Sequence, residues 1–386
     1  MLKIATIVGA RPQIIKAAAI SRVIREIYAG TIKEIILHSG QHYDQNMSQV
    51  FFDELGIPAP TYRMELETGS HGKQSGQMLQ KIEKILIEEN PGAVVVYGDT
   101  NTTLAGALAA SKLRIPVVHV ESGLRSFNKS MPEEINRILC DHVSTLLFSP
   151  TRTGYENLLR EGFRENNKPP FTIDNPRIYH CGDVMFDNAL FFANLADKKS
   201  NILESLDIKG KPFVLCTIHR DSNTDVAERL QSVFSALMET GNRYQIPVII
   251  PLHPRTSKQI KSSLPVEFLS SLKKNNLLSI IDPVSYLDMI LLEKNAKLIL
   301  TDSGGVQKES FFFKKPCIVL RSESEWIELI QNHTAVLADA DQNRIMKAVG
   351  EFIDNPPSSF PPIFGDGKAA EFICGELFKE LQVRVI

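Results

Sequence analysis

Acidic side chains stand at three places in the first half of the chain. Two of them follow short apolar runs, and the third lies at the start of a segment with a helical pattern. Asp99 follows the run 93–97, Glu121 follows the run 117–120, and Glu133 stands in the segment Pro-Glu-Glu-Ile-Asn-Arg at 132–137. Proton transfer at carbon requires a positioned acid and a positioned base. If the three segments meet in one cleft, these carboxylates are the candidates for that chemistry. A single carboxylate at such a place is more often a helix cap or a partner of the helix dipole.

Cationic side chains follow other apolar runs. The run 4–8 continues as Gly-Ala-Arg-Pro-Gln-Ile-Ile-Lys, which places Arg11 and Lys16 near the start of a helix, and His219 closes the run that begins at 213. We expect these side chains to direct positive charge at an anionic substrate. For Arg11 and Lys16 taken alone, two solvated cations on a surface helix are the simpler interpretation. The turn at 9–13 lacks the glycines of a dinucleotide-binding loop, and the chain contains no Gly-x-x-x-x-Gly-Lys segment, so we predict no nicotinamide cofactor and no phosphate-cradling loop of the NTPase type.

A diphosphate site is predicted at residues 301–309, Thr-Asp-Ser-Gly-Gly-Val-Gln-Lys-Glu, where a buried strand ends and a helix begins. Ser303, Gly304 and Gly305 offer a hydroxyl and free backbone N–H groups at the positive end of that helix. Glu309 lies about one and a half turns into the helix, where its carboxylate is suited to a ribose diol. In isolation, the same segment is also typical of a tight capped turn.

Histidine and cysteine side chains form no metal-binding pattern. His119, Glu121, His219 and His253 can be imagined as ligands of one ion, but the histidines fall on different strands without a ligand-spacing signature. We therefore predict that the chain binds no metal. The 5 cysteines are odd in number, form no Cys-x-x-Cys pair and mostly lie in apolar runs, so we expect reduced, buried thiols.

The apolar runs alternate with longer helical patterns, which predicts parallel α/β units. The strand candidates are residues 4–8, 34–38, 93–97, 117–120, 145–148 and 178–181 in the first half, and 213–217, 248–251, 278–281, 298–301 and 317–320 in the second. Helical patterns such as 77–89 and 226–240 lie between strands. We predict an α/β fold of two doubly wound, Rossmann-like domains, with the carboxyl ends of both sheets facing a cleft. The predicted segments are 1–186, which carries the carboxylates, 187–365, which binds the nucleotide, and a last helical segment, 366–386, that packs back on the first domain.

Composition agrees with this architecture. The chain has 386 residues, of which 43% are hydrophobic and 23% are charged, and its formal net charge is −2. This length is more than one hydrophobic core usually serves. The charge balance favours neither nucleic acid nor an anionic membrane as a partner. The N-terminus has no signal-peptide pattern and no apolar run is long enough to span a bilayer, so we expect a cytoplasmic protein.

Taken together, these segments resemble the non-hydrolysing UDP-N-acetylglucosamine 2-epimerase family. The resemblance rests on ordered motifs at 9–16, 98–103, 119–125, 132–137, 219–220, 301–309 and 321–325, which span nearly the whole chain. It implies the two-domain fold of nucleotide-sugar glycosyltransferases and a homodimer. It also implies that Asp99, Glu121 and Glu133 transfer protons or order the site, with His219 as a cation near the diphosphate. The substrate contacts that it implies are Arg11, Lys16, Gln41, Arg137, His253, Ser303, Gly304, Gly305, Glu309 and Arg321.

The activity implied by the resemblance is the interconversion of UDP-N-acetylglucosamine and UDP-N-acetylmannosamine for bacterial surface polysaccharide precursors. UDP is eliminated to leave a 2-acetamidoglucal and is then added back, which requires acid/base groups on two faces of the sugar but neither NAD nor a metal. The segments 9–13 and 321–326 look more like a branch that acts on UDP-2,3-diacetamido-2,3-dideoxyglucuronic acid, which is therefore the alternative substrate.

Three segments differ from the family members that a second UDP-sugar activates, namely 41–44, 67–74 and 221–223, so we do not predict that activation here. Other functions on the same fold are a UDP-sugar glycosyltransferase, a UDP-sugar-binding protein without catalysis, and a hydrolysing epimerase. Turnover of UDP-sugar without an acceptor excludes the glycosyltransferase. Binding without turnover indicates the binding protein, and release of free UDP indicates the hydrolysing epimerase.

Overall fold

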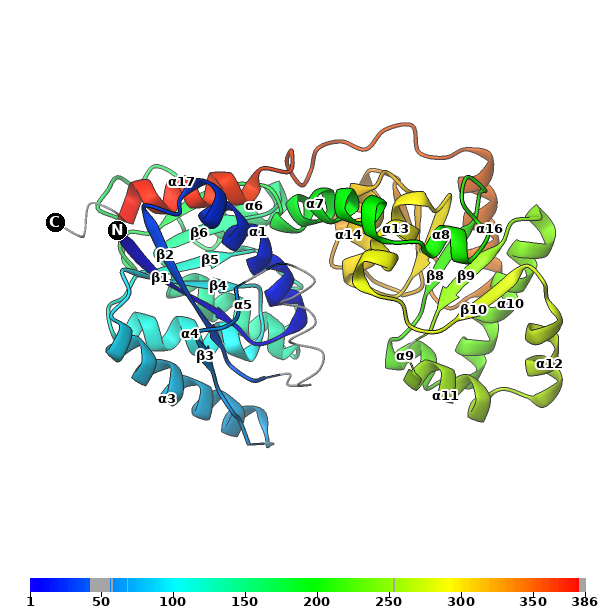
Figure 1. Cartoon of the computed structure of the whole chain (residues 1–386), viewed down its shortest axis with the longest axis horizontal. Coiled ribbons are helices and arrows are strands. Elements are labelled where there is room, and N and C mark those ends of the chain that lie inside the picture. Colours follow the sequence, from blue (N-terminus) through cyan, green and yellow to red (C-terminus); the bar gives the residue numbers. More distant parts are fainter. Residues whose placement is uncertain (42–55, 57, 68, 253, 382–386) are drawn as a thin grey trace. The chain divides into compact units, whose positions relative to one another are not determined.

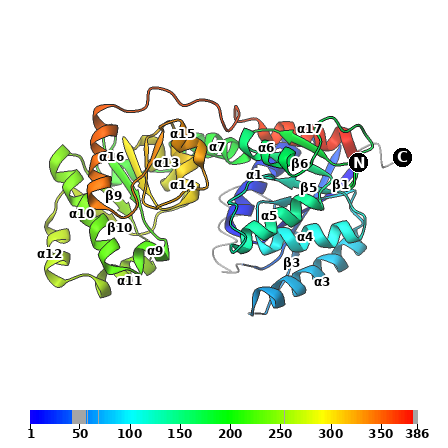
Figure 2. The same ribbon diagram turned by 180° about the vertical axis from the view of Figure 1, so that it is seen from behind.

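The computed structural model describes residues 1–41, 56, 58–67, 69–252 and 254–381. The chain forms two compact units, one made of Met1–Asn188 with Pro362–Ile386 and the other of Ala189–Pro361. Each unit contains a parallel sheet of its own with helices around it (Figure 1, Figure 2).

The first unit contains a seven-stranded sheet in the order β3-β2-β1-β4-β5-β6-β7. Its strands are β1 (Leu2–Val8), β2 (Ile32–His38), β3 (Tyr62–Arg63), β4 (Ala93–Tyr97), β5 (Val117–Val120), β6 (Leu146–Ser149) and β7 (Arg177–His180). All neighbouring strands pair in parallel. The order reverses between β1 and β4, so the turns after these two strands flank the switch point at which doubly wound sheets bind ligands.

Helices cover both faces of this sheet. They are α1 (Arg11–Ile27), α3 (His71–Glu89), α4 (Asn101–Lys112), α5 (Pro132–His142), α6 (Arg152–Arg160), the start of α7 (Val184–Lys199) and α17 (Ala369–Leu381). Helices α3 and α4 pack together, and Met78 and Ile82 of α3 are buried in the core that they share with β1 and β4. Helix α17, drawn in red in Figure 1, lies beside α1, and its Phe372 ring contacts the ring of Tyr179 in β7 edge-on at 5.7 Å.

The second unit repeats the plan with a six-stranded parallel sheet in the order β10-β9-β8-β11-β12-β13. Its strands are β8 (Val214–Thr217), β9 (Val248–Pro251), β10 (Leu278–Ile281), β11 (Leu298–Thr301), β12 (Cys317–Val319) and β13 (Ala335–Leu337). Its helices, after the end of α7, are α8 (Ile202–Ser205), α9 (Asp221–Thr224), α10 (Ala227–Tyr244), α11 (Pro254–Ser263), α12 (Val266–Lys274), α13 (Tyr286–Asn295), α14 (Gly304–Phe312), α15 (Ile327–Gln331) and α16 (Gln342–Asp354). Helices α10 and α16 pack together on one face, where Phe234 and Val349 are fully buried. The switch point of this sheet lies between β8 and β11.

The predicted α/β fold with two doubly wound parallel sheets is confirmed. Strands 93–97, 117–120, 248–251, 278–281 and 298–301 have the predicted bounds. The sequence analysis does not predict β3 and β13, two short strands that lie at sheet edges. Helix α3 begins at His71 rather than at 77, because the Ser70 hydroxyl accepts a hydrogen bond from the Lys73 N–H at 3.4 Å and caps a first turn and a half without apolar residues.

Helix α17 is fastened to the first unit by a carboxylate of α7. Asp187 accepts hydrogen bonds from the N–H groups of Ala369 at 3.2 Å and Ala370 at 2.9 Å. Burial raises the pKa of Asp187 to about 6 in spite of these bonds. The folded protein therefore holds the Asp187 proton more tightly than the unfolded chain does between pH 3.8 and about 6. The stability that this proton contributes is present below that window and is lost as the pH rises through it.

We predict that Asp187→Asn removes this pH dependence. The free energy of unfolding of the wild-type protein minus that of the variant should fall by roughly 2–3 kcal/mol as the pH rises from 3.8 to about 6. Urea unfolding of both proteins at a series of pH values measures the difference. Two curves that run parallel across this window contradict the prediction.

Candidate active-site residues

The two turns at the first switch point are tied together by Gln13, a buried side chain of α1. Its Oε1 accepts the N–H groups of Gly9 at 2.9 Å and Ala10 at 3.1 Å. Its Nε2 donates to the carbonyl oxygen of Tyr97 at 3.0 Å and to the Thr103 hydroxyl at 2.9 Å. The turn after β1 is thereby fixed against the turn after β4. The sequence does not indicate this role, because a glutamine in a first helical turn is unremarkable there.

Asp99 stands in the turn after β4, directly after Gly98, whose φ is 63°. Its carboxylate forms an ion pair with the guanidinium of Arg137, which also lies 3.1 Å from Glu134 Oε2. Although burial opposes the charged form of Arg137, the negative charges of Asp99 and Glu121 raise its pKa. The Asp99 side chain remains 29% exposed. Arg137, a predicted substrate contact, is therefore the ion-pair partner of Asp99, a predicted catalytic carboxylate.

Glu121 follows β5 with a φ of 73°, a left-handed conformation that residues with a Cβ rarely adopt. Its carboxylate forms an ion pair with Lys16, and the two side chains are only 12% and 11% exposed. The Lys16 Nζ lies 3.1 Å from the place that a Cβ of Gly98 would take. Lys16, which we expected to direct positive charge at an anionic substrate, thus lies beside the turns after β4 and β5.

His119 and Glu121 stand two residues apart at the end of β5, but their side chains have different partners. Successive side chains of a strand point to opposite faces, but the positive φ of Glu121 ends this alternation. The Glu121 side chain pairs with Lys16. His119 is fully buried and contacts Asp141 and the Gly98 carbonyl group instead.

The other predicted residues of the first unit stand at helix starts or in a strand-end turn. Glu133 and Arg11 are exposed in the first turns of α5 and α1. Gln41 lies three residues after β2, and its Oε1 accepts hydrogen bonds from the backbone N–H of Thr102 at 3.0 Å and from the Thr102 hydroxyl at 2.7 Å. This contact holds Gln41 against the start of α4.

Glu134, next to the predicted Glu133, has a supporting role that the sequence does not reveal. It is 1% exposed and accepts the N–H groups of Ser126 and Phe127, each at 2.9 Å. Burial alone would raise the pKa of Glu134, but these two N–H groups lower it. The ionised side chain holds the loop before α5 and, through Arg137, steadies Asp99.

In the second unit, His219 is oriented by Asp302, the residue that follows β11. Asp302 is fully buried, and one of its oxygens lies 3.1 Å from His219 Nδ1. The same carboxylate accepts the backbone N–H groups of His219 and Arg220 and the Nδ2–H of Asn223, at 3.0 to 3.1 Å. Burial alone would raise the pKa of Asp302, but His219 and these donors lower it. The imidazole is 49% exposed and thus presents a fixed, accessible ring at the second switch point.

The turn after β11 begins α14 as predicted. Ser303 caps the helix by accepting the Val306 N–H at 3.5 Å, and its own N–H donates to the Thr301 hydroxyl at 2.9 Å. The Trp326 indole N–H donates to the Gly304 carbonyl oxygen at 3.0 Å.

Other side chains surround this turn. A Cβ on Gly304 would lie 3.6 Å from Glu325 Oε2, and one on Gly305 would lie 4.0 Å from Glu309 Oε2. Arg321, a predicted substrate contact, pairs with Glu325 at 2.9 Å. Glu309 is 8% exposed.

A fully buried carboxyl group, Glu293 of α13, lies near Glu309. Burial and the charge of Glu309 raise the pKa of Glu293 well above its ordinary value. Glu293 therefore keeps its proton to a higher pH than an exposed glutamate does. The sequence does not identify this pair, because Glu293 stands in the preceding helix, outside the 301–309 motif.

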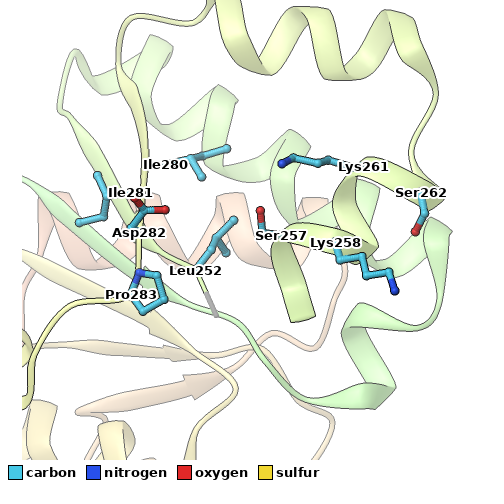
Figure 3. A pocket seen from close by; sticks show the side chains of 9 residues that line it. All are labelled: Leu252, Ser257, Lys258, Lys261, Ser262, Ile280, Ile281, Asp282 and Pro283. Carbon is cyan, nitrogen blue, oxygen red and sulfur yellow. The ribbon is translucent and has the colours of Figure 1, made fainter. Parts of the chain in front are cut away.

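A cavity of about 550 Å³ opens at the carboxyl ends of β9 and β10. Figure 3 shows Leu252, Ile280 and Ile281 on the strand side and Ser257, Lys258 and Lys261 on the side of α11. The cavity lies on the same sheet edge as His219 and Ser303, because all these residues follow or end parallel strands of one sheet. It offers apolar walls together with polar and cationic groups.

Some expectations fall on other parts of the chain. His253 lies outside the described residues. Across residues 1–41, 58–67, 69–252 and 254–381, no group of three or more His, Cys, Asp or Glu side chains is arranged to hold a metal ion. Within the same described part of the chain, no helix combines the length and apolarity needed to cross a membrane.

Two doubly wound sheets with polar and charged side chains at each switch point define a two-domain α/β protein of the nucleotide-sugar-binding class. The sequence pattern described as UDP-N-acetylglucosamine 2-epimerase matches residues 26–377, and the chain belongs to that family. The UDP-2,3-diacetamido-2,3-dideoxy-D-glucuronate 2-epimerase of Pseudomonas aeruginosa is 46% identical over 98% of this chain and 100% of its own length.

Two further relatives come from Methanocaldococcus jannaschii. Its UDP-N-acetylglucosamine 2-epimerase is 43% identical over 96% of this chain and 98% of its own length. The crystal structure of the M. jannaschii UDP-GlcNAc 2-epimerase in complex with UDP-GlcNAc and UDP matches with a TM-score of 0.82 at 42% identity, covering 98% of this chain and 100% of that one. These relatives are UDP-sugar 2-epimerases, which are isomerases.

We predict that Asp302→Asn disturbs both the fold of the second unit and the place of His219. The NH₂ group of the new amide would face N–H groups that need an acceptor. Removing one member of a buried charged network typically lowers the free energy of unfolding by about 3–5 kcal/mol. Urea unfolding measures the loss of stability, and calorimetry with UDP measures the expected loss of affinity. Asp225→Asn is the matched control, because Asp225 is 42% exposed and its surface ion pair with Arg255 contributes at most about 1 kcal/mol. Equal stability of the two variants contradicts the prediction.

Proposed function

We propose that this chain is a non-hydrolysing UDP-N-acetylglucosamine 2-epimerase that interconverts UDP-GlcNAc and UDP-ManNAc. The observation that carries the proposal is the pairing of Asp99 with Arg137 and of Glu121 with Lys16 at the carboxyl edge of one sheet. Inversion at C2 requires that a proton leave one face of the sugar and return to the other, and so it requires two separately held acid/base groups.

In this mechanism the bond between C1 and the diphosphate oxygen breaks, and the developing positive charge at C1 acidifies the C2 proton. One carboxylate of the pair Asp99 and Glu121 removes that proton, which leaves a 2-acetamidoglucal and UDP. The other group, in its acid form, returns a proton to the opposite face of C2, and UDP adds back to C1. Glu133 is either the second base or a group that sets the protonation of the pair.

We assign the proton transfer to the first unit and the binding of UDP to the second. His219, Ser303 and the N–H groups of Gly304 and Gly305 stabilise the charge on the departing diphosphate, and Glu309 accepts the ribose hydroxyls. The cavity at the ends of β9 and β10 suits the uracil ring, which has apolar faces and a polar edge. Further proposed contacts with the substrate are Arg11, Gln41, Arg137, His253 and Arg321.

The second candidate substrate is UDP-2,3-diacetamido-2,3-dideoxyglucuronic acid. The Pseudomonas aeruginosa epimerase named for this sugar is 46% identical to this chain, and the M. jannaschii enzyme named for UDP-N-acetylglucosamine is 43% identical. The mechanism is the same for both sugars, because they share the bonds at C1 and C2 that react.

The resemblance to the family also supports three assignments about the setting of the enzyme. We propose that it is a cytoplasmic homodimer whose product feeds bacterial surface polysaccharide precursors. Sedimentation that shows only monomer at micromolar concentration contradicts the dimer. A glycosyltransferase of the same fold differs from an epimerase in one simple respect, since it leaves UDP-sugar unchanged when no acceptor is present.

We predict that turnover in heavy water places deuterium at C2 of the product, without added NAD and with a metal chelator present. The reason is that the returning proton comes from a carboxyl group in exchange with solvent. Proton NMR of UDP-GlcNAc and of UDP-2,3-diacetamido-2,3-dideoxyglucuronic acid, each incubated with the protein alone, follows both the anomeric signals and the C2 label. Product that carries only protium at C2 refutes elimination through a glycal.

Variants in the same experiment separate the roles of the two units. Asp99→Asn, Glu121→Gln and Glu133→Gln should slow the C2 exchange severely and leave the affinity for UDP largely intact. His219→Ala should lower the affinity for UDP and slow elimination by about 10²-fold, because it removes a partner of the diphosphate. Glu156→Gln, which changes an exposed carboxylate paired with Arg152 on α6, is the control and should behave as the wild type.

A further inference from the structure

A buried hydrogen-bond bridge joins the turn that carries Asp99 to the turn that carries Glu121. Its centre is His119 of β5, which is fully buried. The His119 Nε2 lies 2.8 Å from the carbonyl oxygen of Gly98, the residue before Asp99. The His119 Nδ1 lies 2.7 Å from Asp141 Oδ1.

Asp141, near the end of α5, connects the bridge to the turn after β5. Its Oδ2 accepts the N–H of Gly123 at 3.1 Å and lies 2.7 Å from Arg125 Nη2. Gly123 has a φ of 78°, and a Cβ there would lie 2.3 Å from the Gly154 carbonyl oxygen, so only glycine fits. Asp141 thus holds the turn at Gly123, and Glu121 stands two residues before that point.

The partners of His119 determine where its protons are. A carbonyl oxygen can only accept a hydrogen bond, so the contact with Gly98 requires a proton on Nε2. Burial alone would raise the pKa of Asp141, but His119 and Arg125 lower it, so Asp141 is a carboxylate and also only accepts. The contact with Asp141 therefore requires a proton on Nδ1 as well. The extra cation is balanced locally, because Arg125 also pairs with Glu161 at 2.6 Å.

We propose that His119 is a positioning residue that bridges the two turns as an imidazolium and so sets the place of Asp99 relative to Glu121. This inference rests on the proposed function, in which these two carboxylates exchange protons with C2 of the sugar. The bridge reaches the backbone beside Asp99 and contacts neither carboxylate. Loss of the bridge would displace Asp99 relative to Glu121, and a small displacement of a reacting group can slow a reaction by about 10²-fold.

Two substitutions of His119 test the two halves of the bridge. The amide of Asn can reach the place of Nδ1 and keep the bond to Asp141, whereas the amide of Gln can reach the place of Nε2 and keep the bond to Gly98. We expect His119→Asn to lower kcat for C2 exchange by about 10²-fold and His119→Gln to lower it less. Neither should change the KM for UDP-sugar or the affinity for UDP by more than about twofold, because the diphosphate is bound by other residues.

The matched control is His142→Asn, since His142 follows Asp141 directly in α5 and is 49% exposed. It should leave kcat unchanged. An unchanged kcat in His119→Asn, or a loss of UDP affinity as large as the loss of kcat, overturns the positioning role.

NMR of the wild-type protein labelled with ¹⁵N-histidine tests the bridge without turnover and without a variant that must fold. Both ring nitrogens of the fully buried histidine should give signals of protonated nitrogen at neutral pH. Signals of a neutral tautomer overturn the inference. A wild-type protein that leaves every UDP-sugar unchanged contradicts the proposed function, whereas these NMR signals report on the bridge alone.

Discussion

Buried carboxylates that accept several hydrogen bonds at once hold the turns of the candidate active site. Asp302 accepts hydrogen bonds from the N–H groups at and around His219. Asp141 connects His119 to the turn after β5, and Glu134 holds the loop before α5. Moving an ion from water into a protein interior costs several kcal/mol unless charged partners and hydrogen bonds replace its hydration. The carboxylates therefore fix their donors, and the turns that bear those donors, in one arrangement. A site held in this way does not have to reorganise when charge develops during a reaction.

In the first unit, the carboxylate Asp99, which we propose to react, is more exposed than the supporting carboxylates. The side chain of Asp141 is fully buried, whereas that of Asp99 is 29% exposed. Arg137 pairs with both Asp99 and Glu134, and Lys16 pairs with Glu121. Carboxylates in one site repel each other, and an intervening cation allows each of them to ionise. The ion pairs with Arg137 and Lys16 therefore favour the charged forms of Asp99 and Glu121.

Similarity to epimerases of two different sugars has a simple chemical basis. The sugars of UDP-GlcNAc and UDP-2,3-diacetamido-2,3-dideoxyglucuronic acid differ at C3 and C6, whereas elimination and re-addition take place at C1 and C2. The proposed acid/base pair and the diphosphate contacts therefore serve both. The choice of sugar belongs to side chains around the remaining ring positions, and the experiment with both nucleotide sugars decides it. A shared fold alone does not choose a substrate.

The sequence by itself determined the α/β class, most strand bounds and the places of Asp99, Glu121, His219 and Ser303 at strand ends. It did so because parallel strands are short apolar runs whose carboxyl ends carry the turns, and this information is local in the chain.

Only the tertiary structure decided which side chains meet there. Lys16 pairs with Glu121 and Arg137 with Asp99, and the roles of Asp141 and Asp302 are not visible in their motifs. Such partners are far apart in the chain and are brought together by the strand order, which sets β4 between β1 and β5 and sets β8 beside β11. Burial then removes water as a competing partner, so each buried polar group binds the one that the fold brings to it.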